Sequence, residues 1–270
     1  MTTRLIFFGG GNMAEAIFAG LVSNSNYSIT VIQRNPTKAE TLKAKYQNIT
    51  IKSTLDFTPG ENDIVFLAIK PQQAKEALLP IKALLTQCTI ISVMAGLAIE
   101  TIQAWIGNEK IIRTMPNTPS SIGKGVTAIY SPNSIRQEHR DLCINIFNNI
   151  GSIYVAKDET EIDKIAPFSS SSIAFTYYFI EGFIKSAVEQ FGFEKQDAQK
   201  FIAESMIGAC ELLVSDNEHS IEEQRARVTS KKGMTEQGVI AFEKHDLHAI
   251  INDATQKCYA RAIEMSNEFK

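Results

Sequence analysis

The chain has 270 residues and a formal net charge of −3, from 27 Lys and Arg against 30 Asp and Glu. Hydrophobic residues make up 44% and charged residues 21%, which is ordinary for a soluble globular protein and excludes a chain that stays disordered throughout. No basic field favours nucleic acid, and no apolar run approaches the ~18 residues that cross a membrane.

The first half of the chain alternates strand-like with helix-like segments. Strands are predicted at 4–8, 29–33, 64–69, 89–94 and 110–114, and helices at 12–23, 36–46, 73–85 and 99–106. Segments rich in β-formers at 126–130 and 153–155, around a helix at about 135–150, would extend the same sheet. This alternation predicts an N-terminal Rossmann-type α/β domain with a doubly wound, mostly parallel sheet.

After the polar stretch 157–163 the sequence becomes helical. Apolar residues recur at three- and four-residue spacing over 180–191, 198–213 and 247–265, and Ser220 with Glu223 fits a capping box. The helix that begins near Ile173 is apolar on almost every side, so we expect a partner subunit to cover part of it. We therefore place a Rossmann domain at residues 1–160 and an all-α C-terminal dimerisation domain at residues 161–270.

We expect neither a secreted protein nor a metal-binding one, from the amino-terminal apolar run and from the cysteines and histidines. The amino-terminal apolar run at 5–8 is too short for a signal peptide, so we expect a cytoplasmic protein. The four cysteines include no CxxC pair, which favours reduced thiols over two disulfides. The histidines lack zinc-type spacing, and His245 and His248 are interpreted as surface or capping residues. No metal site is predicted.

Gly9-Gly10-Gly11-Asn12-Met13-Ala14 forms a GxGxxA motif between the first strand and the first helix. In such a turn Gly9 permits the tight bend, Gly11 lets a diphosphate approach the backbone, and Ala14 lets helix and strand pack closely. The free N–H groups and the positive dipole end of the helix then face the diphosphate. The motif alone is weak, but its position favours a dinucleotide site over an ordinary glycine-rich turn.

The end of the second predicted strand bears on which nicotinamide cofactor is used. A carboxylate there would bind the free ribose 2′-hydroxyl of NAD, but the sequence reads Gln33-Arg34-Asn35-Pro36-Thr37-Lys38. The Arg34 guanidinium suits a 2′-phosphate, and no acid repels that phosphate. These residues predict NADPH, with NADH as the alternative cofactor. A solvated surface arginine is the plainer interpretation of Arg34.

Five segments together resemble the pyrroline-5-carboxylate reductase family in their order and spacing, over nearly the whole chain. They are 7–14, 68–71, 92–96, 113–119 and 228–243, which include Ala68-Ile69-Lys70-Pro71 and Arg113-Thr114-Met115-Pro116-Asn117. The resemblance implies reduction of 1-pyrroline-5-carboxylate to L-proline with NAD(P)H, the last step of proline biosynthesis. It also implies homodimers through the C-terminal helices, which the family often arranges into a decamer.

The resemblance extends the cofactor site to further strand ends. Lys70-Pro71 and Ala95-Gly96 follow two strands, where open α/β sheets bind ligands, although proline and glycine also simply end strands. Asn117 lies between two prolines and can bind the nicotinamide carboxamide or ribose, or serve only as a turn residue. The predicted cofactor-binding residues are Gly9, Gly10, Gly11, Asn12, Met13, Ala14, Arg34, Asn35, Ala68, Lys70, Pro71, Ala95, Gly96 and Asn117.

The segment 229–235 precedes helix-forming residues, with Thr235 as the expected N-cap. A helix N-terminus favours an anion, and the substrate that the resemblance implies is a cyclic imine carboxylate. Ser230, Gly233 and Thr235 are therefore predicted to bind it, and the resemblance gives Thr235 a catalytic contact with the ring nitrogen. A purely structural cap is the alternative for Thr235.

The chain departs from the family pattern at two places, and two rival functions stay open. GSGPAY is usual where this chain has 170–175, and SSPGG or similar where it has 229–233 with two lysines. One rival is another NADP-dependent imine or β-hydroxyacid oxidoreductase on the same scaffold. Lys185 and Lys195 are available as its general acid/base, but neither lies in a recognisable motif. The other rival is a non-catalytic NADP-binding regulator.

Overall fold

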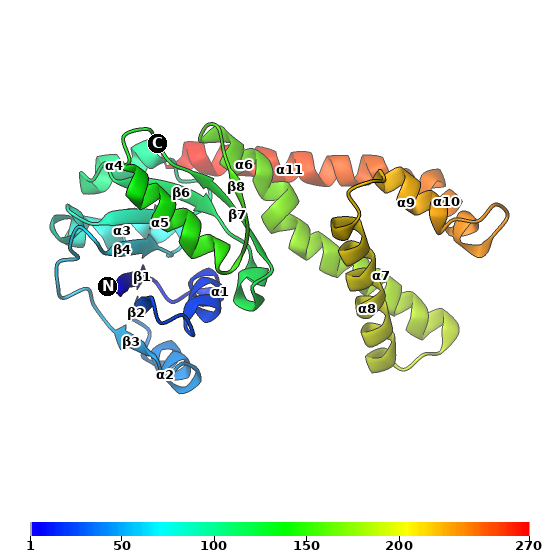
Figure 1. The fold of residues 1–270 in the computed structure, drawn as a ribbon, viewed down its shortest axis with the longest axis horizontal. Helices are drawn as coiled ribbons and strands as arrows, with labels where there is room; N and C mark the ends of the chain where they lie inside the picture. Colours follow the sequence, from blue (N-terminus) through cyan, green and yellow to red (C-terminus); the bar gives the residue numbers. More distant parts are fainter. Residues whose placement is uncertain (1, 270) are drawn as a thin grey trace. The chain divides into compact units, whose positions relative to one another are not determined.

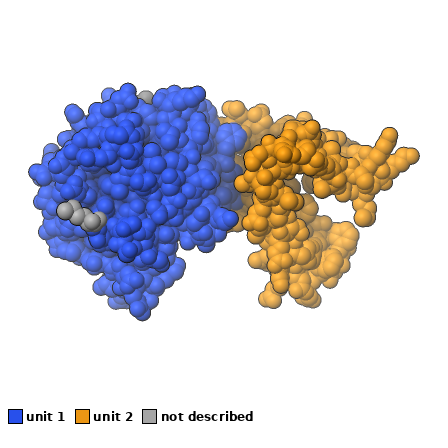
Figure 2. Space-filling view, in the orientation of Figure 1, with its two compact units in different colours: residues 1–173, 257–270 blue, residues 174–256 orange. Residues whose placement is uncertain are grey.

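The computed structural model describes residues 2–269, which form two compact units (Figure 2). Of the described residues, the first unit comprises 2–173 and 257–269, and the second comprises 174–256. The last helix, α11 (Leu247–Glu268), contributes residues to both. The boundary between the units lies between residues 173 and 174. The boundary between the Rossmann domain and the dimerisation domain, placed between residues 160 and 161, stays a prediction.

The first unit contains an eight-stranded sheet with the spatial order β3-β2-β1-β4-β5-β6-β7-β8. Neighbouring strands run parallel, except that β7 is antiparallel to β6. The order of the first six is that of Rossmann folds, and it reverses between β1 and β4. The predicted sheet and its extension are thus confirmed. The strands are β1 (Thr3–Phe8), β2 (Tyr27–Ile32), β3 (Ile49–Lys52), β4 (Ile64–Leu67), β5 (Thr89–Ser92), β6 (Ile111–Met115), β7 (Gly125–Tyr130) and β8 (Gly151–Val155).

Helices lie on both faces of this sheet (Figure 1). On one face, Phe7 and Phe66 stack with ring centroids 4.4 Å apart beneath Phe18 of α1 and Phe147 of α5. On the other face, Ile6 lies in a second core that includes residues of α3 and α4. Successive strand residues enter opposite cores, as the pleat requires. The helices are α1 (Asn12–Leu21), α2 (Pro36–Lys45), α3 (Pro71–Leu78), α4 (Ile99–Ile106), α5 (Gln137–Asn148) and α6 (Thr160–Ala166).

Two local features differ from the sequence-based expectation. The single helix predicted at 73–85 is wrong, because α3 ends at Leu78 and a 3₁₀ helix, η1 (Leu79–Leu85), follows. Pro80 has no N–H and its ring crowds the preceding turn, so the α-helix cannot continue through it. Strand β3 was not predicted, because four residues are too few for periodicity to stand out.

The second unit is helical, as predicted. It contains α8 (Lys195–Ser215), α9 (Ile221–Arg227), α10 (Met234–Lys244) and most of α7 (Ser172–Phe191). The capping box of α9 is confirmed, since Ser220 and Glu223 exchange side-chain to backbone hydrogen bonds of 2.8 and 3.2 Å. No helix within residues 2–269 is long and apolar enough to span a membrane.

The second unit buries few of its own apolar side chains. Its core consists of Ala187, Ala198 and Ile202, whereas Tyr178 is 79% exposed and Met234 is 94% exposed. Exposed apolar area of this extent marks an interaction surface. The observation agrees with the expectation that another subunit covers these helices.

Candidate functional site

The glycine turn lies at the point where the strand order reverses. Gly9 has φ +107°, and a Cβ there would lie 2.5 Å from the carbonyl oxygen of Ala68, so only glycine fits. Gly11 is the N-cap of α1 with ordinary extended backbone, and a Cβ there would meet nothing nearer than 3.8 Å. The fold therefore requires Gly9 but not Gly11. A bare backbone at Gly11 instead leaves space for a ligand.

The rest of the motif also occupies the predicted positions. Gly10 is buried beside Gln33, Asn12 is exposed, and Ala14 is fully buried against the sheet. Asn12 and Met13 supply first-turn N–H groups of α1 at the carboxyl end of β1. This arrangement presents donors and a positive dipole end to an anion.

Glu15, also in the first turn of α1, forms an ion pair with Lys45. Its carboxylate binds Lys45 Nζ at 2.7 Å and accepts from the Tyr46 hydroxyl at 3.1 Å. The hydrogen bond from Lys45 is the main cause that lowers the pKa of Glu15. An ionised acid near the diphosphate position is therefore offset by a paired cation.

A hollow of about 450 Å³ lies at the carboxyl end of β2. Three cations line it, Arg34, Lys43 and Lys52, although Lys52 also pairs with Asp56 at 2.6 Å. Arg34 is exposed at this hollow. Two acids, Glu40 and Asp56, line the same hollow, so the expectation that no acid lies near this position is wrong. The three cations outnumber them, and a guanidinium such as that of Arg34 suits a phosphate. Sequence reasoning missed Lys52, Ser53 and Thr54, because they reach the hollow only through the unpredicted strand β3.

Asn35, a predicted cofactor residue, has a structural role in the chain itself. Its side chain accepts a hydrogen bond from the backbone N–H of Lys38 at 3.0 Å and so caps α2. Its own backbone N–H donates to Gln33 Oε1 at 3.0 Å. A contact between Asn35 and the cofactor stays a prediction.

Two further loops adjoin the same edge of the sheet. Ala68 follows β4, and its N–H donates to Phe8 of β1 at 3.0 Å, next to the glycine turn. Lys70 is exposed and is the N-cap of α3, with Pro71 as the first helical residue. Ala95-Gly96 follows β5, where Ala95 is exposed and Gly96 is buried. The loops lie where open α/β sheets bind ligands.

Asn117 ties three segments together. Its Nδ2 donates to the Ser169 carbonyl at 2.8 Å, and its Oδ1 accepts from the Val126 N–H at 2.8 Å. It is 4% exposed, and Ser169 belongs to the π-helix η3 (Pro167–Ser171). The Ser170 hydroxyl also donates to the Pro116 carbonyl at 3.2 Å. The amide is thus mainly structural, and its contact with the cofactor stays a prediction.

The segment 229–235 forms a tight turn that leads into α10. The Gly233 N–H donates to the Ser230 carbonyl at 2.9 Å, and Gly233 is the N-cap of α10. The expectation that Thr235 caps the helix is therefore wrong, because Gly233 has the extended backbone of an N-cap and the helix begins at Met234. The N-cap thus lies two residues before the expected one. Thr235 lies in the first turn with an exposed side chain that makes no hydrogen bond within residues 2–269.

Lys232 adopts a backbone conformation that glycine prefers. Its φ is +60°, and its N–H donates to Glu236 Oε2 at 2.7 Å. A left-handed conformation costs a residue with a Cβ roughly 1–2 kcal/mol. We expect Lys232→Gly to keep the turn and raise the free energy of unfolding by about 1 kcal/mol, after the added freedom of the unfolded glycine is subtracted. Thermal unfolding of both proteins measures this, and a less stable variant would contradict it.

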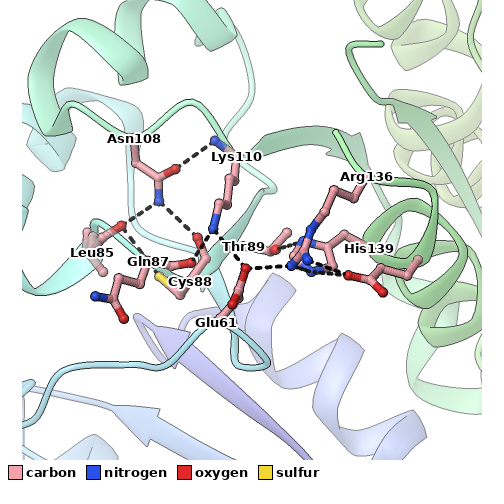
Figure 3. Close-up of polar contacts among 10 residues, drawn as sticks. Glu61, Leu85, Gln87, Cys88, Thr89, Asn108, Lys110, Arg136 and His139 are labelled. Atoms are coloured by element: carbon pink, nitrogen blue, oxygen red, sulfur yellow. Dashed lines mark hydrogen bonds and ion pairs between the residues drawn. The ribbon is translucent and has the colours of Figure 1, made fainter. Parts of the chain in front are cut away.

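The polar cluster of Figure 3, which joins buried residues such as His139 to exposed ones such as Glu61, lies at the opposite ends of the strands. His139 is 5% exposed, bonds Thr89 through Nδ1, and lies 2.8 Å from Arg136 through Nε2. Burial, followed by the charge of Arg136, lowers the pKa of His139. Thr89 begins β5, so this neutral histidine is remote along the strand from the loops at the carboxyl ends. It is a structural residue.

Two family descriptions match the chain. "Pyrroline-5-carboxylate reductase dimerisation" matches residues 159–265, and "NADP oxidoreductase coenzyme F420-dependent" matches residues 4–96. The pyrroline-5-carboxylate reductase of Staphylococcus haemolyticus is 30% identical over 268 residues, which cover 97% of this chain and 98% of that protein. The enzyme of the same name from Vibrio alginolyticus is 29% identical over 270 residues, 98% of each chain.

Solved structures agree with these relatives. A pyrroline-5-carboxylate reductase from Coxiella burnetii superposes with a TM-score of 0.83 at 29% identity, covering 98% of this chain and 99% of that chain. Pyrroline carboxylate reductase from Plasmodium falciparum, solved with NADP bound, has a TM-score of 0.83 at 24% identity, covering 97% and 99%. The second likeness shows the shared fold.

Proposed function

The chain belongs to the pyrroline-5-carboxylate reductase family, and we propose that it reduces 1-pyrroline-5-carboxylate to L-proline by hydride transfer from NADPH. One observation carries this proposal. The GxGxxA turn lies where the strand order of the sheet reverses, with bare backbone at Gly11, in a chain that a reductase of this name matches over 97% of its length. The proposed product places the enzyme at the last step of proline biosynthesis.

Residues of the first unit fit the cofactor. The diphosphate is assigned to the N-terminus of α1, at residues 9–14, and the 2′-phosphate to the hollow beside Arg34. The strand-end residues Ala68, Lys70-Pro71 and Ala95-Gly96 are assigned to the rest of the nucleotide, with Asn35 and Asn117 as further contacts. NADH remains an alternative cofactor.

Arg34→Ala tests the assignment of the 2′-phosphate. We expect KM for NADPH to rise roughly 10- to 100-fold, because hydrogen bonds to charged groups contribute about 1.5–3 kcal/mol. KM for NADH should stay unchanged, since NADH has no phosphate at this position. Arg136→Ala, which removes a half-exposed cation near the amino ends of the strands, is the matched control. Equal KM changes for both cofactors would contradict the assignment.

The substrate carboxylate is assigned to the turn before α10. Ser230 and Gly233 are joined in that turn, and α10 directs its first-turn N–H groups and positive dipole end toward this side. Thr235 offers an exposed hydroxyl, which we assign to the ring nitrogen. Lys231 and Lys232, where the family has other residues, add positive charge beside an anion.

The protein positions the two reactants and provides the electrostatic environment of the reaction, whereas the reducing equivalent comes from the cofactor. The bound nicotinamide supplies the hydride that reduces the C=N carbon. Holding the two reactants in reacting geometry is an advantage that can reach ~7–11 kcal/mol. The proton on the ring nitrogen comes from solution, or through water held by the Thr235 hydroxyl.

Assembly and location complete the proposal. We propose a homodimer through the C-terminal helices, with a decamer as a further arrangement, in the cytoplasm, without nucleic-acid or membrane partners. The dimerisation family that matches residues 159–265 and the exposed apolar side chains of the second unit support the dimer. Light scattering from the purified protein distinguishes a dimer from a decamer.

A comparison of substrates with both cofactors tests the function. Oxidation of NADPH that depends on 1-pyrroline-5-carboxylate supports the proposed reaction. Oxidation with other cyclic imines alone, or reaction only with β-hydroxyacids, would replace it with another oxidoreductase on this scaffold. Tight NADPH binding without turnover of any of these substrates would indicate the non-catalytic regulator.

A further inference from the structure

Arg113 is a buried cation between two carboxylates. It lies on β6 with its side chain 2% exposed. Its guanidinium binds Glu159 at 3.2 Å and Asp163, on α6, at 2.6 Å. All three residues belong to the first unit. The group therefore joins a central strand to the segment that starts α6.

Glu159 makes a second contact that reaches the cofactor edge of the sheet. The same Oε1 atom that pairs with Arg113 accepts a hydrogen bond from the Ile99 N–H at 2.8 Å. Ile99 is the first residue of α4, and the loop 93–98 connects it to β5. The carboxylate thus holds the far end of that loop.

The near end of the same loop is also attached to β6. The Thr114 hydroxyl donates to the Ser92 carbonyl at 3.1 Å, and Ser92 is the last residue of β5. Arg113 and Thr114 are consecutive in β6. This strand therefore holds both ends of the loop, one directly through Thr114 and the other through the contact of Arg113 with Glu159. The loop contains the predicted cofactor residues Ala95 and Gly96, and Ala95 is exposed.

Stability alone is a weak explanation for this arrangement. The Arg113–Asp163 pair is buried on both sides, whereas the Glu159 side chain is 26% exposed. A buried ion pair often contributes less than a well-packed apolar replacement, because both charges lose their water. Here the guanidinium also keeps one nitrogen, Nε, without a hydrogen-bond partner in the part of the chain that the structure describes. The burial of these charges costs free energy, but the ion pairs fix the position of the Glu159 carboxylate. Such a group suits the role of holding a neighbouring loop in place.

We propose that Glu159, oriented by Arg113, is a positioning residue for hydride transfer, because it fixes the loop 93–98 beside the nicotinamide. This inference rests on the proposed function, which puts the cofactor at the carboxyl ends of the strands. Glu159 acts through the Ile99 N–H and not by touching the cofactor. The diphosphate and the 2′-phosphate are assigned to other residues, 9–14 and Arg34.

Glu159→Ala separates positioning from binding. We expect kcat to fall by about tenfold or more, since small displacements of reacting groups cost up to ~10²-fold in rate. The affinity for 2′,5′-ADP, a probe of the adenine half alone, should stay unchanged. Glu159→Gln keeps a side-chain oxygen for the Ile99 N–H and should restore most of kcat. If the alanine variant does not fold, Glu159→Met keeps the length, removes the acceptor and replaces it in the comparison.

Arg4→Met is the matched control for lost stability. Arg4 forms an ion pair with the buried Asp63 near the amino ends of β1 and β4, so its loss should lower the unfolding temperature and leave kcat unchanged. The inference is overturned if kcat of Glu159→Ala equals wild type, if Arg4→Met loses as much, or if Glu159→Gln loses as much as alanine. An inactive wild type would instead overturn the proposed function.

Discussion

Replacing Thr235 with alanine is expected to lower kcat by about 10²-fold and to leave the affinity for NADPH unchanged, because we assign its hydroxyl to the ring nitrogen of the substrate and not to the cofactor. The structure makes this variant informative. Thr235 does not cap α10 and its side chain makes no hydrogen bond within residues 2–269, so alanine removes no hydrogen bond from the fold. Alanine also has the higher helix propensity, by at most about 0.7 kcal/mol.

The control for this prediction is Thr235→Ser, which keeps the hydroxyl and should retain most of kcat. Steady-state rates with 1-pyrroline-5-carboxylate and a fluorescence titration with NADPH give the two quantities. If the alanine variant turns over as fast as wild type, Thr235 has no part in the chemistry. If serine loses as much as alanine, the methyl group and not the hydroxyl is what matters.

Gly11→Ala is expected to weaken NADPH binding roughly 10- to 100-fold, because a Cβ would push the diphosphate away from the N–H donors of α1. The chain itself tolerates the change, since a Cβ at Gly11 meets nothing nearer than 3.8 Å and the backbone is extended. The cost in unfolding free energy should be about 1 kcal/mol or less, as for other N-cap substitutions. Isothermal titration with NADPH and thermal unfolding separate the two effects.

Two other glycines serve as controls for that result. Gly9→Ala should lose both stability and binding, since its Cβ would collide with the Ala68 carbonyl at φ +107°. Gly107 also has a positive φ, +69°, but a Cβ there would have no atom within 4 Å. Gly107→Ala should therefore lower the free energy of unfolding by about 1–2 kcal/mol and leave NADPH binding intact. If Gly11→Ala binds NADPH like wild type, the diphosphate does not lie on this turn.

The sheet could be predicted from the sequence because its signals are local. Continuous apolar runs such as residues 64–69 indicate buried parallel strands, and the glycine motif needs only its neighbours to be interpreted. Ser220 and Glu223 likewise predict a cap within a single helical turn. Patterns that span a few residues remain valid whatever the rest of the chain does.

The features that could not be predicted depend on distant residues or on a single backbone angle. The pairing of Arg113 with Glu159 and Asp163 joins residues 46 and 50 positions apart, which no spacing rule indicates. Asn117 satisfies backbone groups of β7 and η3 that only the fold brings together. The N-cap of α10 is Gly233 and not Thr235, because the extended backbone that precedes the helix lies at Gly233.

The most direct test of the account follows the hydride itself. The substrate is 1-pyrroline-5-carboxylate, and the NADPH carries deuterium in place of the C4 hydrogen that is transferred. The product is examined by mass spectrometry and NMR. We expect L-proline with one deuterium on the ring carbon that is bonded to nitrogen and remote from the carboxylate. Proline without deuterium at that carbon, or no proline, would contradict direct hydride transfer from NADPH to the C=N carbon.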